Sequence, residues 1–224
     1  MTEPSSARPK RNVKSVDETA AGSVASSGIE PEDQARANLY GLVSRLFYAP
    51  ADSHLLAEIC HTGEGGEAQE SAGGLLPAWR NLQEACRNAY PPVVKQEYDS
   101  LFVGVGRAEI TPYLSAYAEA SAPDRFLVRL RQQISDLGLA RRESAFEVED
   151  HVSGLNDVMR WFIESGRPLR EQQQFFATFL YQGAIPFYAA VQNAASSRFY
   201  KPVAAFALAF LELEKAAFEM VDTA

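Results

Sequence analysis

The chain has 224 residues, of which 46% are hydrophobic and 22% charged, so it can form one sizeable domain plus a tail, or two small domains. Its net charge of −8 argues against nucleic-acid binding, which needs a basic face toward the phosphates. The same acidic balance would attract a basic peptide, although it is also ordinary in cytosolic proteins. No apolar run approaches the roughly twenty residues that span a membrane, so no stable membrane insertion is expected.

The first 31 residues are rich in Ser, Ala, Thr, Pro and charge. Because they can bury little apolar surface, we predict a disordered tail over residues 1–31 and one folded domain over 32–224. The segment has no apolar core of the kind a secretory signal requires. Arg8-Pro9-Lys10-Arg11 is basic but lacks paired arginines before a hydrophobic stretch, so it is no twin-arginine signal. We therefore expect a cytoplasmic protein.

The first helical pattern begins at Pro31-Glu32-Asp33, where proline and acids favour a helix start, and it ends near Pro50. A short second helix, capped by Ser53, is expected to run to Ile59. The segment 61–74 contains five glycines and predicts a mobile loop.

Helical periodicity returns over 76–89, and Pro91-Pro92 then opens a helix that reaches Val103. Gly104-Val105-Gly106 ends this helix. The glycine pair could suggest a phosphate loop, but no strand precedes it and no Gly-Lys-Ser/Thr follows, so a helix C-cap is the better interpretation.

Four more helices are predicted in the second half of the chain, over 122–139, 147–163, 169–194 and 200–221. Pro186 should kink or split the third of them. The last one carries an apolar stripe of Phe206, Phe210, Leu213 and Phe218. With no alternating strand pattern and no internal repeat, the sequence predicts an all-α, single-domain bundle of about eight helices.

Few side chains suggest chemistry. Cys60 and Cys86 are the two cysteines, and no Cys or His spacing completes a zinc set, so both are predicted to be small core or semi-buried residues. Asp150-His151 is the one plausible acid–base pair, but neighbours on a helix point about 100° apart, and no activated nucleophile is evident. The simplest interpretation places Asp150 in the first turn of a helix with His151 partly buried. No cofactor or metal is predicted.

Aromatic and apolar side chains gather at one helix end and its following loop. Tyr98, Leu101 and Phe102 are expected to cap the core. Pro112 and Tyr113 lie in a loop between polar residues, where tyrosine offers a large contact area and a hydrogen-bonding tip, a combination enriched at recognition surfaces.

These residues also carry a family resemblance. Tyr98-x-x-Leu101-Phe102 resembles the helix-ending Tyr-x-x-Leu-Phe of the cytoplasmic chaperones of molybdenum redox enzymes, the TorD/DmsD/NarJ superfamily. Pro112-Tyr113-x-Ser115-x-Tyr117 is similar to its Pro-x-x-Ser-x-Tyr/Trp loop. Glu147-x-x-Asp150-His151 is similar to its Glu-Pro-x-Asp-His element, with Val148 where the family has proline. The ordered set spans roughly residues 33 to 220.

The resemblance implies a non-catalytic chaperone of the TorD/DmsD-like branch, a monomer or domain-swapped dimer. Its partners would be the catalytic subunit of a molybdopterin-containing oxidoreductase and that subunit's twin-arginine signal peptide, held back from export until the cofactor is in place. The residues that would line or support the peptide site are Leu101, Phe102, Pro112, Tyr113, Ser115, Tyr117, Glu147, Asp150 and His151. Carboxylates such as Glu147 and Asp150 can bind Arg in bidentate fashion.

Two alternatives stay open. One, within the same superfamily, is a chaperone of a nitrate-reductase-type subunit that lacks an exported signal. The other, from a different class, is an α-helical metal-dependent hydrolase that uses Asp150 and His151.

Overall fold

The computed structural model describes residues 29–62, 74–104, 108–139 and 149–221. The helices are α1 (Pro31–Tyr48), α2 (Ser53–His61), α3 (Leu75–Arg87), α4 (Pro91–Tyr98), α5 (Ser115–Ala118), α6 (Pro123–Asp136), α7 (Val152–Glu164), α8 (Leu169–Phe175), α9 (Gln182–Asn193) and α10 (Tyr200–Val221), with π-helical stretches η2 (Asp99–Val103) and η3 (Phe176–Tyr181). The all-α prediction is confirmed, since the described ranges hold no strand. The tail predicted over 1–31 and the loop predicted over 61–74 fall largely outside these ranges and stay predictions.

Several predicted boundaries change. Asp52, not Ser53, caps α2, because the Asp52 backbone is still extended and its carboxylate accepts the Leu55 N–H at 2.8 Å. The helix predicted from residue 147 begins at Val152. The run predicted over 169–194 is interrupted by η3 rather than at Pro186, which lies within α9.

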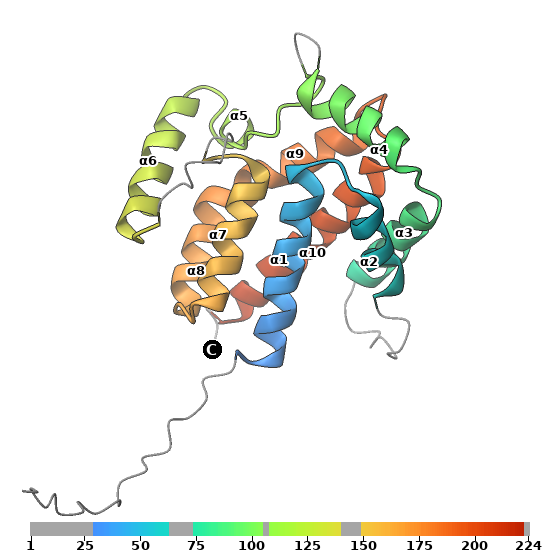
Figure 1. Ribbon diagram of the computed structural model, residues 1–224. Helices are drawn as coiled ribbons and strands as arrows, with labels where there is room; N and C mark the ends of the chain where they lie inside the picture. The colour runs from blue at the N-terminus through green and yellow to red at the C-terminus, as the bar shows by residue number, and fades with distance from the viewer. Residues whose placement is uncertain (1–28, 63–73, 105–107, 140–148, 222–224) are drawn as a thin grey trace, which may run out of the picture.

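The bundle is built around α1, which packs along α7, while α10 packs on α9 and α3 (Figure 1). Aromatic rings fill the space between these helices. Phe47 of α1 lies within 5.4–6.1 Å, between ring centroids, of Phe102, Phe187, Tyr188 and Tyr200. Leu213 was predicted on the apolar stripe of α10, but its side chain is 40% exposed, so this part of the prediction is wrong.

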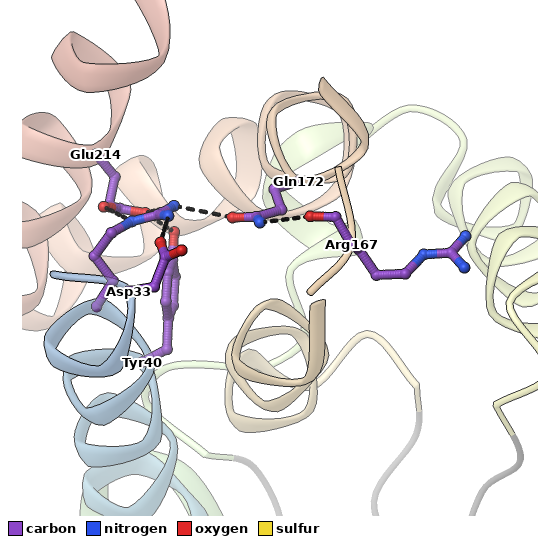
Figure 2. A network of polar contacts seen from close by, with 6 residues as sticks. Asp33, Tyr40, Arg167, Gln172 and Glu214 are labelled. Atoms are coloured by element: carbon purple, nitrogen blue, oxygen red, sulfur yellow. Dashed lines mark hydrogen bonds and ion pairs between the residues drawn. The ribbon is translucent and has the colours of Figure 1, made fainter. Parts of the chain in front are cut away.

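A polar network joins α1, α8 and α10 (Figure 2). The Arg36 guanidinium donates to both oxygens of Glu214, at 2.8 and 2.9 Å, and to Gln172 at 3.1 Å. Tyr40 donates its hydroxyl to Glu214 at 2.9 Å. Glu214 is only 3% exposed, and the Arg36 guanidinium compensates its buried negative charge. Burial, aided by the Glu214 charge, raises the pKa of Tyr40 well above its ordinary value.

A second buried carboxylate determines where α10 begins. Glu97 of α4 accepts the backbone N–H groups of Arg198, Phe199 and Tyr200 at 2.8–3.0 Å. These are unpaired donors of a helix start, and an acid is favoured there by the helix dipole. Glu97 therefore holds the start of α10 beside α4, where the Tyr200 ring lies 5.2 Å from Phe102 of η2. Within the described ranges, no helix is both long and apolar enough to cross a membrane.

Candidate functional site

The loop before α5 is held to the chain just before α7 by a short antiparallel contact. Leu114 donates its N–H to the Asp150 carbonyl at 2.9 Å, and Val152 donates to the Pro112 carbonyl at 2.9 Å. These bonds make an isolated bridge between Tyr113 and His151. Because His151 is extended where it forms this bridge, α7 starts only at Val152.

Asp150 and His151 therefore precede α7, and the prediction that Asp150 lies in a helical first turn is wrong. Asp150 is 2% exposed, and its Oδ2 accepts the Ser115 N–H at 3.3 Å, at the start of α5. His151 is the N-cap of α7, where its Nδ1 accepts the Ser153 N–H at 3.2 Å. The Asp150 side chain thus supports the loop before α5, and the His151 side chain supports the start of α7.

Beside this contact lies a cleft of about 710 Å³. We call it the aromatic cleft, and its described lining residues are Tyr98, Phe102, Val103, Ala108, Glu109, Ile110, Thr111, Pro112, Tyr113, Ala116, Tyr117, His151 and Ala190. Such a volume accommodates side chains of an extended or helical peptide.

The rings of the aromatic cleft are fixed by their polar tips and by one another. The Tyr98 hydroxyl donates to the carbonyls of Phe47 and Tyr48, at the C-terminal end of α1. Tyr117 donates to the Thr111 carbonyl at 3.0 Å, and burial raises the pKa of its phenol. The Tyr113 ring meets the His151 ring edge to face, with centroids 5.6 Å apart.

Two glycines allow this arrangement. Gly104 has a φ of 63°, donates its N–H to Asp99 in the five-residue spacing of a π-helix, and ends η2. Gly183 of α9 lies so close to the loop that a Cβ there would meet the Leu114 Cβ and carbonyl oxygen at 2.8 Å. The loop therefore packs directly on the α9 backbone.

The described lining of the cleft combines one acid with aromatic rings. Glu109 lines it and accepts a hydrogen bond from Ser196, and none of its described lining residues is Lys or Arg. Three other hollows contain both cations and acids: Arg45, Arg160 and Glu58 in one of about 650 Å³, Arg129, Arg167, Asp136 and Glu171 in one of about 480 Å³, and Lys95 and Asp99 in one of about 530 Å³. Glu109 and the aromatic rings beside it are groups that bind cationic ligands.

The predicted site residues separate into two groups. Phe102, Pro112, Tyr113, Tyr117 and His151 line the aromatic cleft. Leu101, Ser115 and Asp150 lie buried behind it, at 0%, 5% and 2% exposure. Glu147 lies outside the described residues.

Sequence reasoning missed Glu109, the one carboxylate of the described lining. It is an acid three positions before Pro112 of the aromatic loop, and that proximity was the available signal. The Glu109 carboxylate is held by a hydrogen bond from Ser196. Ser196 is 87 positions away, so the sequence could not have paired the two residues. Within the described ranges, no three His, Cys, Asp or Glu side chains gather as a metal site would require.

Among solved structures, the chain is similar to a proposed redox enzyme maturation protein from Archaeoglobus fulgidus. The two share 21% sequence identity with a TM-score of 0.52, over 79% of this chain and 93% of that one. This likeness defines the class of fold, an all-α bundle. No curated protein matches the chain.

The family follows from the sequence match. Residues 68–188, more than half of the chain, match the family described as nitrate reductase delta subunit. The chain therefore belongs to this family of NarJ/TorD-like redox-enzyme maturation chaperones, which confirms the resemblance noted in its motifs. The matched range contains the whole described lining of the aromatic cleft except Ala190.

Proposed function

We propose that this chain is a cytoplasmic chaperone that binds the twin-arginine signal peptide and the apo form of a molybdopterin-dependent oxidoreductase catalytic subunit. It assists cofactor insertion and delays export until the enzyme is mature. The peptide binds in the aromatic cleft, with Glu109, Tyr113 and Tyr117 in contact with it, while Asp150 holds the loop from behind.

The observation that carries this proposal is the charge of the cleft lining. A twin-arginine peptide offers two guanidiniums and an apolar segment. Guanidiniums bind carboxylates and stack on aromatic faces, and the described lining supplies Glu109 and the aromatic rings of Tyr98, Phe102, Tyr113 and Tyr117. The apolar segment of the peptide would pack on Phe102, Val103 and Ile110.

Titrating a labelled twin-arginine peptide against wild type and Glu109→Gln tests the proposal. Losing a charge-assisted hydrogen bond costs about 1.5–3 kcal/mol, so the Kd should rise roughly ten- to hundredfold, and the loss should shrink at high salt. Tyr113→Ala should also weaken binding, with less response to salt. Glu84→Gln, on the exposed face of α3, is the control and should bind as wild type does. Equal affinity for all four proteins would contradict the proposal.

A second candidate is a chaperone of a nitrate-reductase-type subunit without an exported signal, and the description of the matched family favours it. The two candidates differ in how strongly peptide binding should depend on the two arginines of the peptide. A peptide in which both arginines are replaced by glutamine should lose most of its affinity under the first candidate. If this peptide binds as well as the parent, the second candidate is preferred.

A further inference from the structure

The charge of the chain is unevenly divided between its first residues and the rest. Residues 1–14 contain four cations, Arg8, Lys10, Arg11 and Lys14, against one acid, Glu3. The chain as a whole carries a net charge of −8, so the remainder is more acidic than the total. The N-terminal segment is therefore attracted to acidic parts of its own chain.

The sequence of this segment shares the chemistry of the ligand proposed above. Lys10 and Arg11 are adjacent cations, and the apolar residues Val13 and Val16 follow them. A twin-arginine peptide likewise presents adjacent cations next to apolar residues. A cleft that binds one by a carboxylate and aromatic faces has the groups to bind the other.

The segment is long enough to reach the aromatic cleft. The cleft lies near the C-terminal end of α1, where Tyr98 contacts the carbonyls of Phe47 and Tyr48. The 18 residues of α1 rise about 27 Å at 1.5 Å per residue. The 20 residues from Arg11 to Pro31 can span up to about 70 Å when extended, more than twice that distance.

We propose that Lys10 and Arg11 occupy the aromatic cleft of their own chain when no client is bound, and that a client peptide must displace them. This proposal rests on the proposed function for the identity of the client, but not for the contact between segment and cleft. The segment then acts as an internal competitor that rejects weakly binding cationic peptides.

The expected strength follows from tethering. A short tether holds its segment at an effective concentration on the order of 1 mM. If the free segment bound the cleft with a Kd of about 0.1 mM, the tethered segment would weaken client binding about tenfold. Such competition is strong enough to measure and weak enough for a client to overcome.

Charge reversal in the full chain tests the competition. Lys10→Glu with Arg11→Glu should tighten binding of the twin-arginine peptide about tenfold. The control is Arg80→Glu with Arg170→Glu, two exposed residues outside the cleft lining, which changes the net charge equally. Because the control measures the general gain from added negative charge, only a gain beyond it supports the proposal. An equal gain in both double variants would overturn it.

Photo-crosslinking tests the contact without any client. A benzoylphenylalanine placed at Val13 in the full chain should crosslink within its own chain to residues 108–117, and less so after Lys10→Glu with Arg11→Glu. Excess twin-arginine peptide should compete with the crosslink. Crosslinks elsewhere, no crosslink, or products of dimer mass would overturn the proposal. If no variant binds the peptide but the crosslink forms as expected, the proposed function fails while the contact stands.

Discussion

Two of the buried carboxylates of this protein, Glu214 and Asp150, have different partners. Where α1, α8 and α10 meet, Glu214 binds the Arg36 guanidinium and the Tyr40 hydroxyl. Beside the aromatic cleft, Asp150 accepts the backbone N–H of Ser115, over a longer distance of 3.3 Å. The first region joins helices around a compensated charge, whereas the second positions a loop next to open volume. The comparison indicates that the scaffold is held more strongly than the site it supports.

The largest effect should follow from Glu214→Ala. It leaves Arg36 and the buried Tyr40 hydroxyl without their shared acceptor, which should lower the free energy of unfolding by about 3–5 kcal/mol in urea denaturation. Glu219→Ala, an exposed acid of the same helix, should cost less than about 1 kcal/mol. Similar losses in both variants would remove the distinction between scaffold and surface.

A smaller effect is expected from Gly183→Ala, because the new Cβ would meet the Leu114 side chain and carbonyl at 2.8 Å. The overpacking should cost about 1–3 kcal/mol and displace the cleft loop, so peptide affinity should fall with stability. Gly154→Ala is the matched control, since its Cβ would meet only the Glu149 carbonyl, at 3.6 Å. Unchanged peptide affinity in Gly183→Ala would show that the loop position does not matter for binding.

Asp150→Ala should cost about 1–2 kcal/mol, because the buried Ser115 N–H loses its acceptor. Asp150→Asn keeps an oxygen at that position and should recover most of the loss in both stability and peptide affinity. If Asn restores stability but not affinity, the charge of Asp150 contributes to binding directly.

The smallest effect concerns alkaline pH, where Tyr40 represents the scaffold and Tyr117 the cleft. Burial raises the pKa of both phenols, so the native state keeps protons that the unfolded chain loses near pH 10. Stability should therefore fall as the pH rises above about 10, by at most about 1.4 kcal/mol per pH unit for each tyrosine. Urea denaturation at pH 9, 10 and 11 should show a shallower decline for Tyr40→Phe, and a smaller change for Tyr117→Phe. A decline as steep as that of wild type in Tyr40→Phe would contradict this assignment.

Local signals predicted most of the fold. Helical periodicity placed α10 at its observed bounds, and Pro91-Pro92 marked the start of α4. Errors arose where distant residues decide the local structure. The Pro112–Val152 and Leu114–Asp150 hydrogen bonds delay the start of α7, and no pattern within residues 147–152 reveals them.

In the site too, the sequence predicted what local residues determine and missed what distant contacts determine. The aromatic residues of the cleft were recognisable because tyrosine and proline between polar residues are unusual for a core. The burial of Asp150 and the presence of Glu109 in the cleft depend on contacts 35 and 87 positions apart along the chain, which a single sequence does not show.

The contact between Glu97 and the start of α10 also has a consequence for synthesis. The three N–H groups that Glu97 accepts belong to residues about a hundred positions later. A ribosome adds about 5–20 residues per second, so roughly 5–20 seconds pass between the synthesis of Glu97 and the synthesis of its three N–H partners. Until then, Phe102 lacks the Tyr200 ring that lies 5.2 Å from it in the folded protein. A nascent chain therefore exposes an incomplete cleft, and client binding should begin only after α10 has been made.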